Sequence, residues 1–492
     1  MDLSSWIERH AAFQPRKVAI RFEGQAIDYA TLAQRIRLAA SVLAKRGVAA
    51  GDRVAYLGLN RPEMIELVFA CARLGAIFVP LNWRLAPPEH AYILGNAEPR
   101  LLVVESELQA GLPRMERIVL DAAVHDWPDG DVPPAAGQPA SPVLIVYTSG
   151  TTGRPKGAVL TQDALLCNAL NAVHAHDLAS SDRVLTVLPM FHVGALNIQT
   201  LPALHAGAEV ILHRRFDPAA TLQAIAAERP NLAVLVPATI AAMIEHPRWQ
   251  DTDITSLRMV TTGSSIVPAR LIQAFHDRDV PVIQVYGSTE TAPIAVYLRA
   301  EHARAHVGST GLPGLHCEAR ILAADGGEAA PGVRGEILVR GGNVMREYWR
   351  DPAGTAEALA DGWFHTGDIA HRDEHGFFHV DERKKDLIIS GGENVYPAEL
   401  EEVLLEDPTV AEAAVVARPH PRWGEEPVAV VVARPGTAPA SAAILRRFDG
   451  RLARFKHPRD VVFVERLPRN AMGKVLRYEL RAMLAGRART GS

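Results

Sequence analysis

Short apolar runs alternate along the chain with segments whose apolar residues repeat at helical spacing. Residues 53–57 and 76–80 are apolar runs of strand length, and the segment 63–74 between them has the helical pattern and ends at Gly75. Further runs of strand length occur at 183–188, 209–212, 232–235 and 259–262, with a helical segment at 218–228. Strands that alternate with helices predict layered, mostly parallel α/β structure.

The N-terminal segment has a different pattern. Residues 3–13 form an amphipathic helical pattern, and 19–22 and 26–29 read as two strands of a hairpin. Thr31 is predicted to cap a second helix that runs to Arg46.

The last third of the chain contains shorter elements. Between 307 and 340, short β segments separated by glycines predict a small barrel or mixed sheet. Further on, strand patterns at 411–416, 427–432 and 460–463 and a helical pattern at 441–454 predict a small α+β domain. The predicted fold is therefore α/β, with a large N-terminal domain and a smaller C-terminal one.

Length, composition and charge narrow the class of protein. With 492 residues, 48% of them hydrophobic and 22% charged, the chain resembles a globular protein of two or more compact units. Its net charge of −4 provides no general attraction for nucleic acid. Cys71, Cys167 and Cys317 lie far apart and form no CxxC motif, which argues against structural zinc and thiol catalysis. No apolar run is long enough for a membrane span, and residue 2 is acidic, unlike a signal peptide. A cytoplasmic protein is expected, and a homodimer stays an open alternative.

A loop rich in glycines and hydroxyls follows the apolar run 143–147. It reads Thr148, Ser149, Gly150, Thr151, Thr152, Gly153, Arg154, Pro155, Lys156 and Gly157. Glycines allow several backbone N–H groups to turn toward one point, and the hydroxyls and Lys156 add donors and positive charge, so the loop suits an oxyanion. The Walker A pattern is excluded, because two residues separate Gly153 from Lys156 and no Ser or Thr follows the lysine.

A second turn of this kind follows the apolar run 282–285. It reads Tyr286, Gly287, Ser288, Thr289 and Glu290. An aromatic ring stacks well on a base, and a hydroxyl and a carboxylate are suitable ligands for Mg²⁺.

Both turns resemble signature motifs of the adenylate-forming (ANL) superfamily, in its acyl-CoA synthetase branch. The resemblance extends from about residue 19 to 477, and the sequence looks closest to fatty-acyl and feruloyl-type CoA ligases. The further matching motifs lie at 189–194, 362–368, 382–386, 387–397 and 468–474. Two departures stand out: Ser264 and Ser265 follow Gly263 where the family usually has Gly-Gly-Ala, and Glu382 stands where Asp is more common.

The resemblance implies a role for each matching residue. Lys474, Thr289, Glu290 and His192 would be catalytic, Glu290 and Thr151 would hold Mg²⁺, and Lys385 would be the hinge between domains 1–384 and 386–492. Phe191, His192, Val193 and Ile294 would line the acyl pocket, and Ser390, Gly391, Gly392 and Trp423 would bind CoA. The implied ATP- and AMP-binding set is Thr148, Ser149, Gly150, Thr151, Thr152, Gly153, Lys156, Gly263, Ser264, Ser265, Tyr286, Gly287, Ser288, Thr289, Asp368 and Arg383.

The implied activity is that of an ATP-dependent carboxylic acid–CoA ligase. The acid attacks the α-phosphate of Mg·ATP to give acyl-AMP and pyrophosphate, and CoA then displaces AMP. The apolar pocket residues favour a fatty acid or an aryl acid such as a hydroxycinnamate. Two alternatives stay open: a ligase that loads the phosphopantetheine of a carrier protein, and a non-catalytic nucleotide-binding relic. The pairs His302/His306 and His371/His375 lack a third metal ligand in the sequence pattern.

Overall fold

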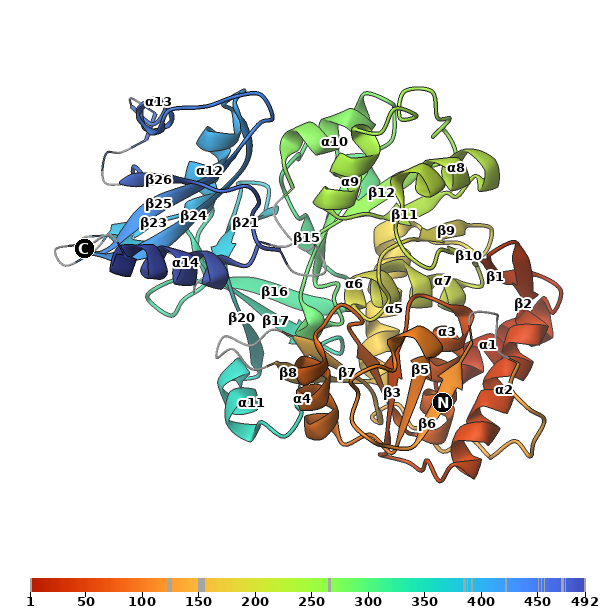
Figure 1. The fold of residues 1–492 in the computed structure, drawn as a ribbon. Coiled ribbons are helices and arrows are strands. Elements are labelled where there is room, and N and C mark those ends of the chain that lie inside the picture. The colour runs from red at the N-terminus through yellow and green to blue at the C-terminus, as the bar shows by residue number, and fades with distance from the viewer. Residues whose placement is uncertain are drawn as a thin grey trace. The chain divides into compact units, whose positions relative to one another are not determined.

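The computed structural model describes residues 2–121, 126–148, 155–263, 267–383, 386, 388–390, 393–420, 423–449, 451–452, 454, 456–469, 473 and 475–490. The chain forms two compact units (Figure 1). The first comprises residues 1–320 and 338–365, and the second comprises 321–337 and 366–492. Both combine helices and sheets, so the predicted α/β class with a smaller C-terminal unit is confirmed. Within the described residues, no helix has both the length and the apolar character needed to cross a bilayer.

The first unit contains a nine-stranded sheet in the order β15-β14-β13-β12-β11-β9-β10-β1-β2. From β1 through β10, β9, β11 and β12 to β13, neighbouring strands are parallel, whereas β2, β14 and β15 pair antiparallel. The strands are β1 (Val18–Phe22), β2 (Gln25–Asp28), β9 (Arg183–Thr186), β10 (Glu209–Leu212), β11 (Leu232–Val234), β12 (Met259–Thr262), β13 (Val282–Tyr286), β14 (Val296–Tyr297) and β15 (Leu312–Pro313). Parallel strands place their carboxyl ends at one edge, which is where ligands bind in such sheets.

A seven-stranded sheet in the same unit has the order β18-β8-β7-β4-β3-β5-β6. Its strands are β3 (Arg53–Leu57), β4 (Ile77–Leu81), β5 (Leu101–Glu105), β6 (Arg117–Leu120), β7 (Pro142–Thr148), β8 (Lys156–Thr161) and β18 (Glu347–Tyr348). Strands β6, β5, β3, β4 and β7 are parallel to one another, whereas β8 pairs antiparallel with β7 and β18 pairs antiparallel with β8. One face buries Leu57, Val79, Val104 and Ile145 against Ile93 and Leu94 of α4, so the core lies between this face and that helix.

Helices cover both sheets, and Figure 1 shows α8, α9 and α10 along β11 and β12. The described helices of this unit are α1 (Ser4–Phe13), α2 (Tyr29–Lys45), α3 (Pro62–Leu74), α4 (Pro87–Ala97), α5 (Gln162–His176), α6 (Val193–Ala195), α7 (Leu201–Ala206), α8 (Pro218–Glu228), α9 (Pro237–Ile244), α10 (Ala269–His276) and α11 (Pro352–Ala358). The short turns are the 3₁₀ helices η1 (Ser106–Leu108), η3 (Thr289–Thr291) and η4 (Ala300–His302) and the π-helix η2 (Leu196–Thr200).

The cap of α2 differs from the prediction. Helix α2 begins at Tyr29, and Asp28 is its N-cap, with Oδ1 accepting a hydrogen bond of 2.8 Å from the backbone N–H of Thr31. Thr31, the predicted N-cap, instead lies inside the helix and donates its backbone N–H to the cap. Both residue types are good N-caps, and the earlier one has the extended backbone that the position requires.

The region 317–383 contributes a further sheet in the order β16-β17-β20-β19, with β21 on β20. A small barrel or mixed sheet was predicted for residues 307–340, and these residues contribute β16 and most of β17 to this sheet. Its strands are β16 (Cys317–Leu322), β17 (Gly335–Gly341), β19 (Leu359–Ala360), β20 (Trp363–Arg372) and β21 (Phe378–Arg383).

The second unit also has a sheet of its own, in the order β23-β22-β25-β24 with β26 on β25. Alternate residues of β24 face opposite sides: Val415 packs with Leu400 of α12, whereas Val416 packs with Leu480 of α14. The sheet is therefore buried on both faces. The elements are β22 (Ile388–Ser390), β23 (Glu393–Val395), α12 (Pro397–Leu405), β24 (Val410–His420), β25 (Gly424–Ala433), α13 (Ser441–Arg446), β26 (Asp460–Phe463) and α14 (Arg477–Thr490).

Candidate active site

Three of the predicted site segments follow strands of one parallel sheet. The chain passes from β9 to His192, from β12 to Gly263, and from β13 to the turn that begins at Gly287. Because β9, β11, β12 and β13 are parallel, their carboxyl ends lie at the same edge. The fold thus brings together segments that lie up to about a hundred residues apart.

The turn after β13 is fixed by a close backbone approach. A Cβ atom at Gly287 would lie 1.7 Å from the carbonyl oxygen of Pro293, so no other residue fits without moving the chain. The backbone N–H of Ser288 donates to Oγ1 of Thr291 at 2.9 Å, which closes the turn around Thr289 and Glu290. Both Thr289 and Glu290 are buried.

The carboxylate of Glu290 has a defined partner in Tyr348. The Tyr348 hydroxyl donates to Oε1 of Glu290 at 2.8 Å, and the backbone N–H of Met345 donates to the Glu290 carbonyl oxygen at 2.7 Å. Glu290 is 8% exposed, so its side chain is held at a buried position with a directed hydrogen bond. Tyr348 was not predicted as a site residue.

Lys156 belongs to the same cluster. Its Nζ lies 5.1 Å from the centre of the Tyr348 ring and 2.9 Å from Oδ2 of Asp351. Asp351 is the N-cap of α11, and a hydrogen bond from the backbone N–H of Gly354, together with Lys156, lowers the pKa of its carboxyl. Tyr348 therefore contacts both Lys156, the predicted phosphate-binding cation, and Glu290, the predicted magnesium ligand.

Strand pairing explains how this cluster forms. In the β7·β8 hairpin Thr148 is opposite Lys156, and Oγ1 of Thr148 donates to the Lys156 carbonyl oxygen at 3.4 Å. Strand β18 then pairs with β8, with Tyr348 opposite Ala158. This pairing brings Tyr348 and Asp351 to the start of β8 from almost 200 residues further along the chain. Neither residue belongs to a recognisable sequence motif, so no local pattern predicts its place in the site.

His192 is held in its neutral form by its surroundings. The side chain caps α6, with Nδ1 accepting a hydrogen bond of 3.0 Å from the backbone N–H of Gly194, so the proton of the neutral ring resides on Nε2. Although the residue keeps some exposed surface, desolvation of the ring lowers its pKa to about 4. At neutral pH His192 is therefore an uncharged ring with one N–H available to donate.

The other predicted acyl-pocket residues are buried and apolar. Phe191, Val193 and Ile294 are all within the core, and the backbone N–H of Ile294 donates to Oδ1 of Asn168 at 3.0 Å. At Gly263 a Cβ atom would lie 2.6 Å from the carbonyl oxygen of Val285, so β12 and β13 leave no room for a side chain there.

In the second unit, Asp368 on β20 is opposite Arg383 on β21. Asp368 is 6% exposed, and its backbone N–H donates to Oγ1 of Thr366 at 3.1 Å. Ser390 is also buried and is opposite Gly424 on β25. Trp423 is 39% exposed and stacks on His420, with 6.5 Å between ring centres.

Several predicted site residues lie outside the described residues, and their predictions stand as made. These are Ser149, Gly150, Thr151, Thr152, Gly153, Ser264, Ser265, Lys385, Gly391, Gly392 and Lys474.

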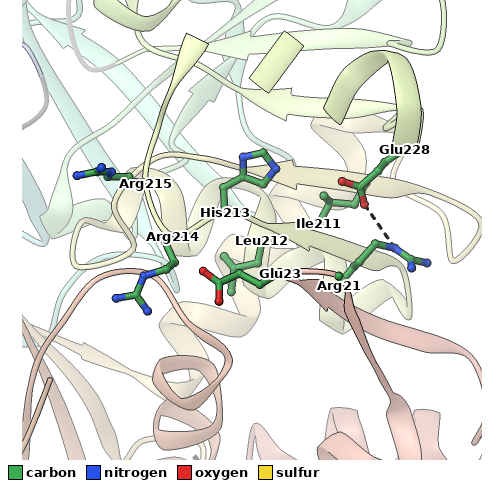
Figure 2. A pocket seen from close by; sticks show the side chains of 9 residues that line it. Arg21, Glu23, Ile211, Leu212, His213, Arg214, Arg215 and Glu228 are labelled. Atoms are coloured by element: carbon green, nitrogen blue, oxygen red, sulfur yellow. Dashed lines mark ion pairs between the residues drawn. The ribbon is translucent and has the colours of Figure 1, made fainter. Parts of the chain in front are cut away.

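One surface pocket lies away from all of these residues. Figure 2 shows its lining side chains, among them Arg21, His213, Arg214 and Arg215, which come from β1 and from the segment that follows β10. The pocket has a volume of about 350 Å³. Two of its cations are already paired: Arg21 lies 2.9 Å from Glu209 and 3.5 Å from Glu228, and Arg214 lies 2.8 Å from Glu105. The pocket is therefore of mixed charge, and it contains none of the predicted site residues.

Comparison with known proteins decides the family. The sequence model of the AMP-binding enzyme family matches residues 7–349, and that of the AMP-binding enzyme C-terminal domain matches residues 399–474. The chain belongs to the AMP-binding enzyme family. The resemblance to adenylate-forming CoA ligases is thereby confirmed, and the protein is an AMP-forming acid–thiol ligase.

Individual members of the AMP-binding family match the chain from end to end. Indoleacetate–CoA ligase from Aromatoleum aromaticum is 51% identical and covers 99% of this chain and 98% of its own length. Feruloyl-CoA synthase from an Amycolatopsis species is 43% identical, with 97% and 98% covered. A solved structure of o-succinylbenzoate coenzyme A synthetase (MenE) from Bacillus subtilis, in complex with ATP and magnesium ion, has a TM-score of 0.86 and 32% identity, with 96% and 98% covered.

Proposed function

We propose that the protein ligates an aryl carboxylic acid to CoA through an acyl-adenylate. The observation that carries this proposal is the end-to-end similarity to two relatives named for aryl acids, indoleacetate and ferulate. The buried apolar residues Phe191, Val193 and Ile294 support it, because an aryl ring buries its surface against such side chains. A fatty acid is the second candidate, because apolar walls also suit an alkyl chain.

In the first half-reaction the carboxylate of the acid attacks the α-phosphate of ATP and pyrophosphate leaves. We assign Lys156 and the loop 148–153 to the departing phosphates, because a cation and converging N–H donors stabilise developing negative charge. We assign Lys474 to the charge that develops between the carboxylate and the α-phosphate. The neutral ring of His192, with its proton on Nε2, would donate a hydrogen bond to the carboxylate without adding a charge to the pocket.

A magnesium ion bound with ATP would neutralise part of the charge on the phosphates. The residues present fit such an ion: Glu290 offers a buried carboxylate whose position is fixed by Tyr348, and the predicted second ligand is the hydroxyl of Thr151. Mg²⁺ usually keeps several waters and takes one or two protein ligands beside the phosphates, so a larger cluster of acids is not needed. Among the described residues, no group of three or more His, Cys, Asp or Glu side chains forms a metal site.

In the second half-reaction the thiolate of CoA attacks the acyl carbon and AMP leaves. We assign Asp368 and Arg383 to the ribose and Trp423 and Ser390 to the approach of CoA. Rotation of the C-terminal domain about Lys385 would let one active site serve both half-reactions, because a hinge of one or two residues can absorb a large change in φ and ψ.

Product analysis tests the proposal directly. The purified protein is incubated with ATP, CoA and each of four acids: indole-3-acetate, ferulate, octanoate and palmitate. AMP, pyrophosphate and an aryl-CoA thioester are expected, with the aryl acids favoured over the fatty acids. Formation of ADP and phosphate would contradict the ligase chemistry, and AMP formation without any CoA thioester would favour a carrier-protein acceptor.

A further inference from the structure

The second compact unit extends across the predicted hinge. It contains residues 321–337 and 366–383, which precede Lys385, as well as the sheet and helices that follow Lys385. A rotation about Lys385 has to move these two parts of the unit against each other. Contacts between the two parts therefore determine how readily such a rotation occurs.

Arg334 precedes the predicted hinge and contacts two residues that follow it. Its Nη2 donates to Oε1 of Glu399 on α12 at 3.1 Å, and its Cζ lies 4.1 Å from the centre of the Tyr396 ring. A planar guanidinium suits both contacts, because it can stack on a ring and still direct an N–H group at a carboxylate. On its own side of the hinge, Nε of Arg334 lies 3.3 Å from Oδ2 of Asp381 on β21. Arg334 thus joins the part before Lys385 to the part after it.

The carboxylate of Glu399 is shared between the two parts. Oε1 accepts from Arg334, whereas Oε2 accepts from Nζ of Lys456 at 2.6 Å, and Lys456 follows the hinge as Glu399 does. Although burial alone would raise the pKa of Glu399, the hydrogen bonds from Lys456 and Arg334 hold this pKa below its ordinary value. Glu399 is therefore ionised at neutral pH and pairs with one cation from each part.

These contacts can open without leaving a charge unpaired. If the two parts separate, Glu399 keeps Lys456, and Arg334 keeps Asp381, which also pairs with Nδ1 of His371 at 2.9 Å. The separation breaks the hydrogen bond between Arg334 and Glu399 and the ring contact with Tyr396. A buried charge that loses its partner is strongly destabilising, so the retained partners are what make this contact reversible.

We propose that Arg334 is a reversible latch that holds the C-terminal domain in one of the two orientations that the half-reactions require. This inference rests on the proposed function and adds a positioning residue to it, because Arg334 acts through Glu399 and Tyr396. A contact made in one orientation only shifts the balance between the two by as much as it contributes. A partly exposed ion pair and a cation–π contact are both weak, so this shift is about three- to tenfold.

Arg334→Gln tests the latch, because glutamine keeps a polar side chain but has no charge. Two rates are measured: acid-dependent ATP–pyrophosphate exchange without CoA, and conversion of synthetic acyl-adenylate to the thioester. The half-reaction that uses the latched orientation should slow and the other should not, so the ratio of the two rates should change by about three- to tenfold. Glu399→Gln should change this ratio in the same direction. Arg334→Lys, which keeps the charge but not the planar group, should give an intermediate ratio.

Arg372→Gln is the matched control. Arg372 on β20 lies 2.8 Å from Glu328 in an ion pair that is also partly exposed, but both partners precede Lys385. Its replacement should leave the ratio of the two rates within about twofold of the wild-type value. A change as large as that in Arg334→Gln would overturn the assignment, because an ion pair that does not cross the hinge would then have the same effect.

Thermal unfolding separates a latch from a purely structural role. A structural role predicts a lower Tm and equal slowing of both half-reactions in Arg334→Gln, and this result would overturn the latch. If Arg334→Gln does not fold, Glu399→Gln carries the same test, and an unchanged ratio in that variant would overturn the latch. Normal half-reactions with an unchanged ratio in Arg334→Gln would overturn the latch alone. Failure of the wild-type protein to form AMP with any acid would overturn the proposed function as well.

Discussion

The hydroxyl of Tyr348 donates a 2.8 Å hydrogen bond to the carboxylate of Glu290, while the ring of the same tyrosine lies 5.1 Å from Nζ of Lys156. One side chain thus touches a predicted magnesium ligand and a predicted phosphate-binding cation. It reaches both from a two-residue strand that pairs with β8.

The first prediction separates the two contacts of Tyr348. Tyr348→Phe keeps the ring beside Lys156 but removes the hydrogen bond that orients Glu290. A hydrogen bond to a charged group contributes about 1.5–3 kcal/mol, so acid-dependent ATP–pyrophosphate exchange should slow by roughly ten- to a hundredfold. The loss should be partly recovered at high Mg²⁺ concentration, as measured by a magnesium titration.

Tyr29→Phe is the control for this change. The Tyr29 hydroxyl is also buried and donates to the Ala208 carbonyl oxygen at 2.7 Å, at a position away from the candidate site. Its loss should reduce stability and leave the magnesium dependence as in the wild-type protein. For comparison, Glu290→Ala should slow exchange by on the order of a hundredfold or more. If Tyr348→Phe shows no change in its magnesium dependence, the assigned role of Glu290 is wrong.

The second prediction concerns the ion pair between Lys156 and Asp351. ATP must compete with the Asp351 carboxylate for Lys156, so Asp351→Asn should lower the KM for ATP several-fold. The stability of the protein should change little, because such a partly exposed pair contributes only about 0–1 kcal/mol and the amide oxygen can still cap α11. Steady-state kinetics and thermal unfolding measure the two effects. An increased KM for ATP would mean that Asp351 instead positions Lys156 for binding.

The third prediction follows from the low pKa of His192. The folded ring has a pKa of about 4, below the ordinary value of about 6.5. Between these values the unfolded chain binds more protons than the folded one, so stability rises with pH in this window and is lost as the pH falls from about 6.5 toward 4. A single such group gives a slope of at most about 1.4 kcal/mol per pH unit.

His192→Asn provides the test, because asparagine can still accept the hydrogen bond from Gly194 at the helix cap. Urea unfolding at several pH values between 4.5 and 8 should show a shallower slope for the variant. Burial also lowers the pKa of His176 to about 4. Because His176 is present in both proteins, it does not affect the difference between their slopes. Equal slopes would show that His192 does not titrate as described.

The fourth prediction separates the two half-reactions. Lys385→Pro fixes φ near −65° at the predicted hinge, so pyrophosphate exchange should stay near normal while thioester formation falls strongly. Lys474→Ala should do the opposite: exchange is lost, and synthetic acyl-adenylate is still converted to the thioester. Each variant is assayed for both half-reactions. Equal loss of both activities in both variants would argue against alternation of the domains.

The parts of the site that consist of short, contiguous motifs could be predicted from the sequence. The turn at 286–290 and the hairpin around Lys156 each follow an apolar run, and a strand is found at both places. Tyr348 and Asp351 were missed because their roles depend on the long-range pairing of β18 with β8, for which a sequence pattern of two residues gives no signal.

Element boundaries show a second limit of sequence reasoning. The helix predicted at 441–454 ends at Arg446, and the strand predicted at 183–188 ends at Thr186. Apolar spacing continues beyond both ends, because buried loops also contain apolar residues. The overall α/β class was predictable because it depends on the alternation of many elements, whereas a single boundary depends on local hydrogen bonds.

The contact between Gly287 and Pro293 has a consequence for engineering. Since the two residues meet at a distance that excludes a side chain, the turn that contains Glu290 and the segment that contains Ile294 form one rigid loop. Chimeric enzymes that exchange the acyl pocket should therefore take residues 286–294 from a single parent. A crossover inside this stretch would combine two backbones that were never selected to fit each other.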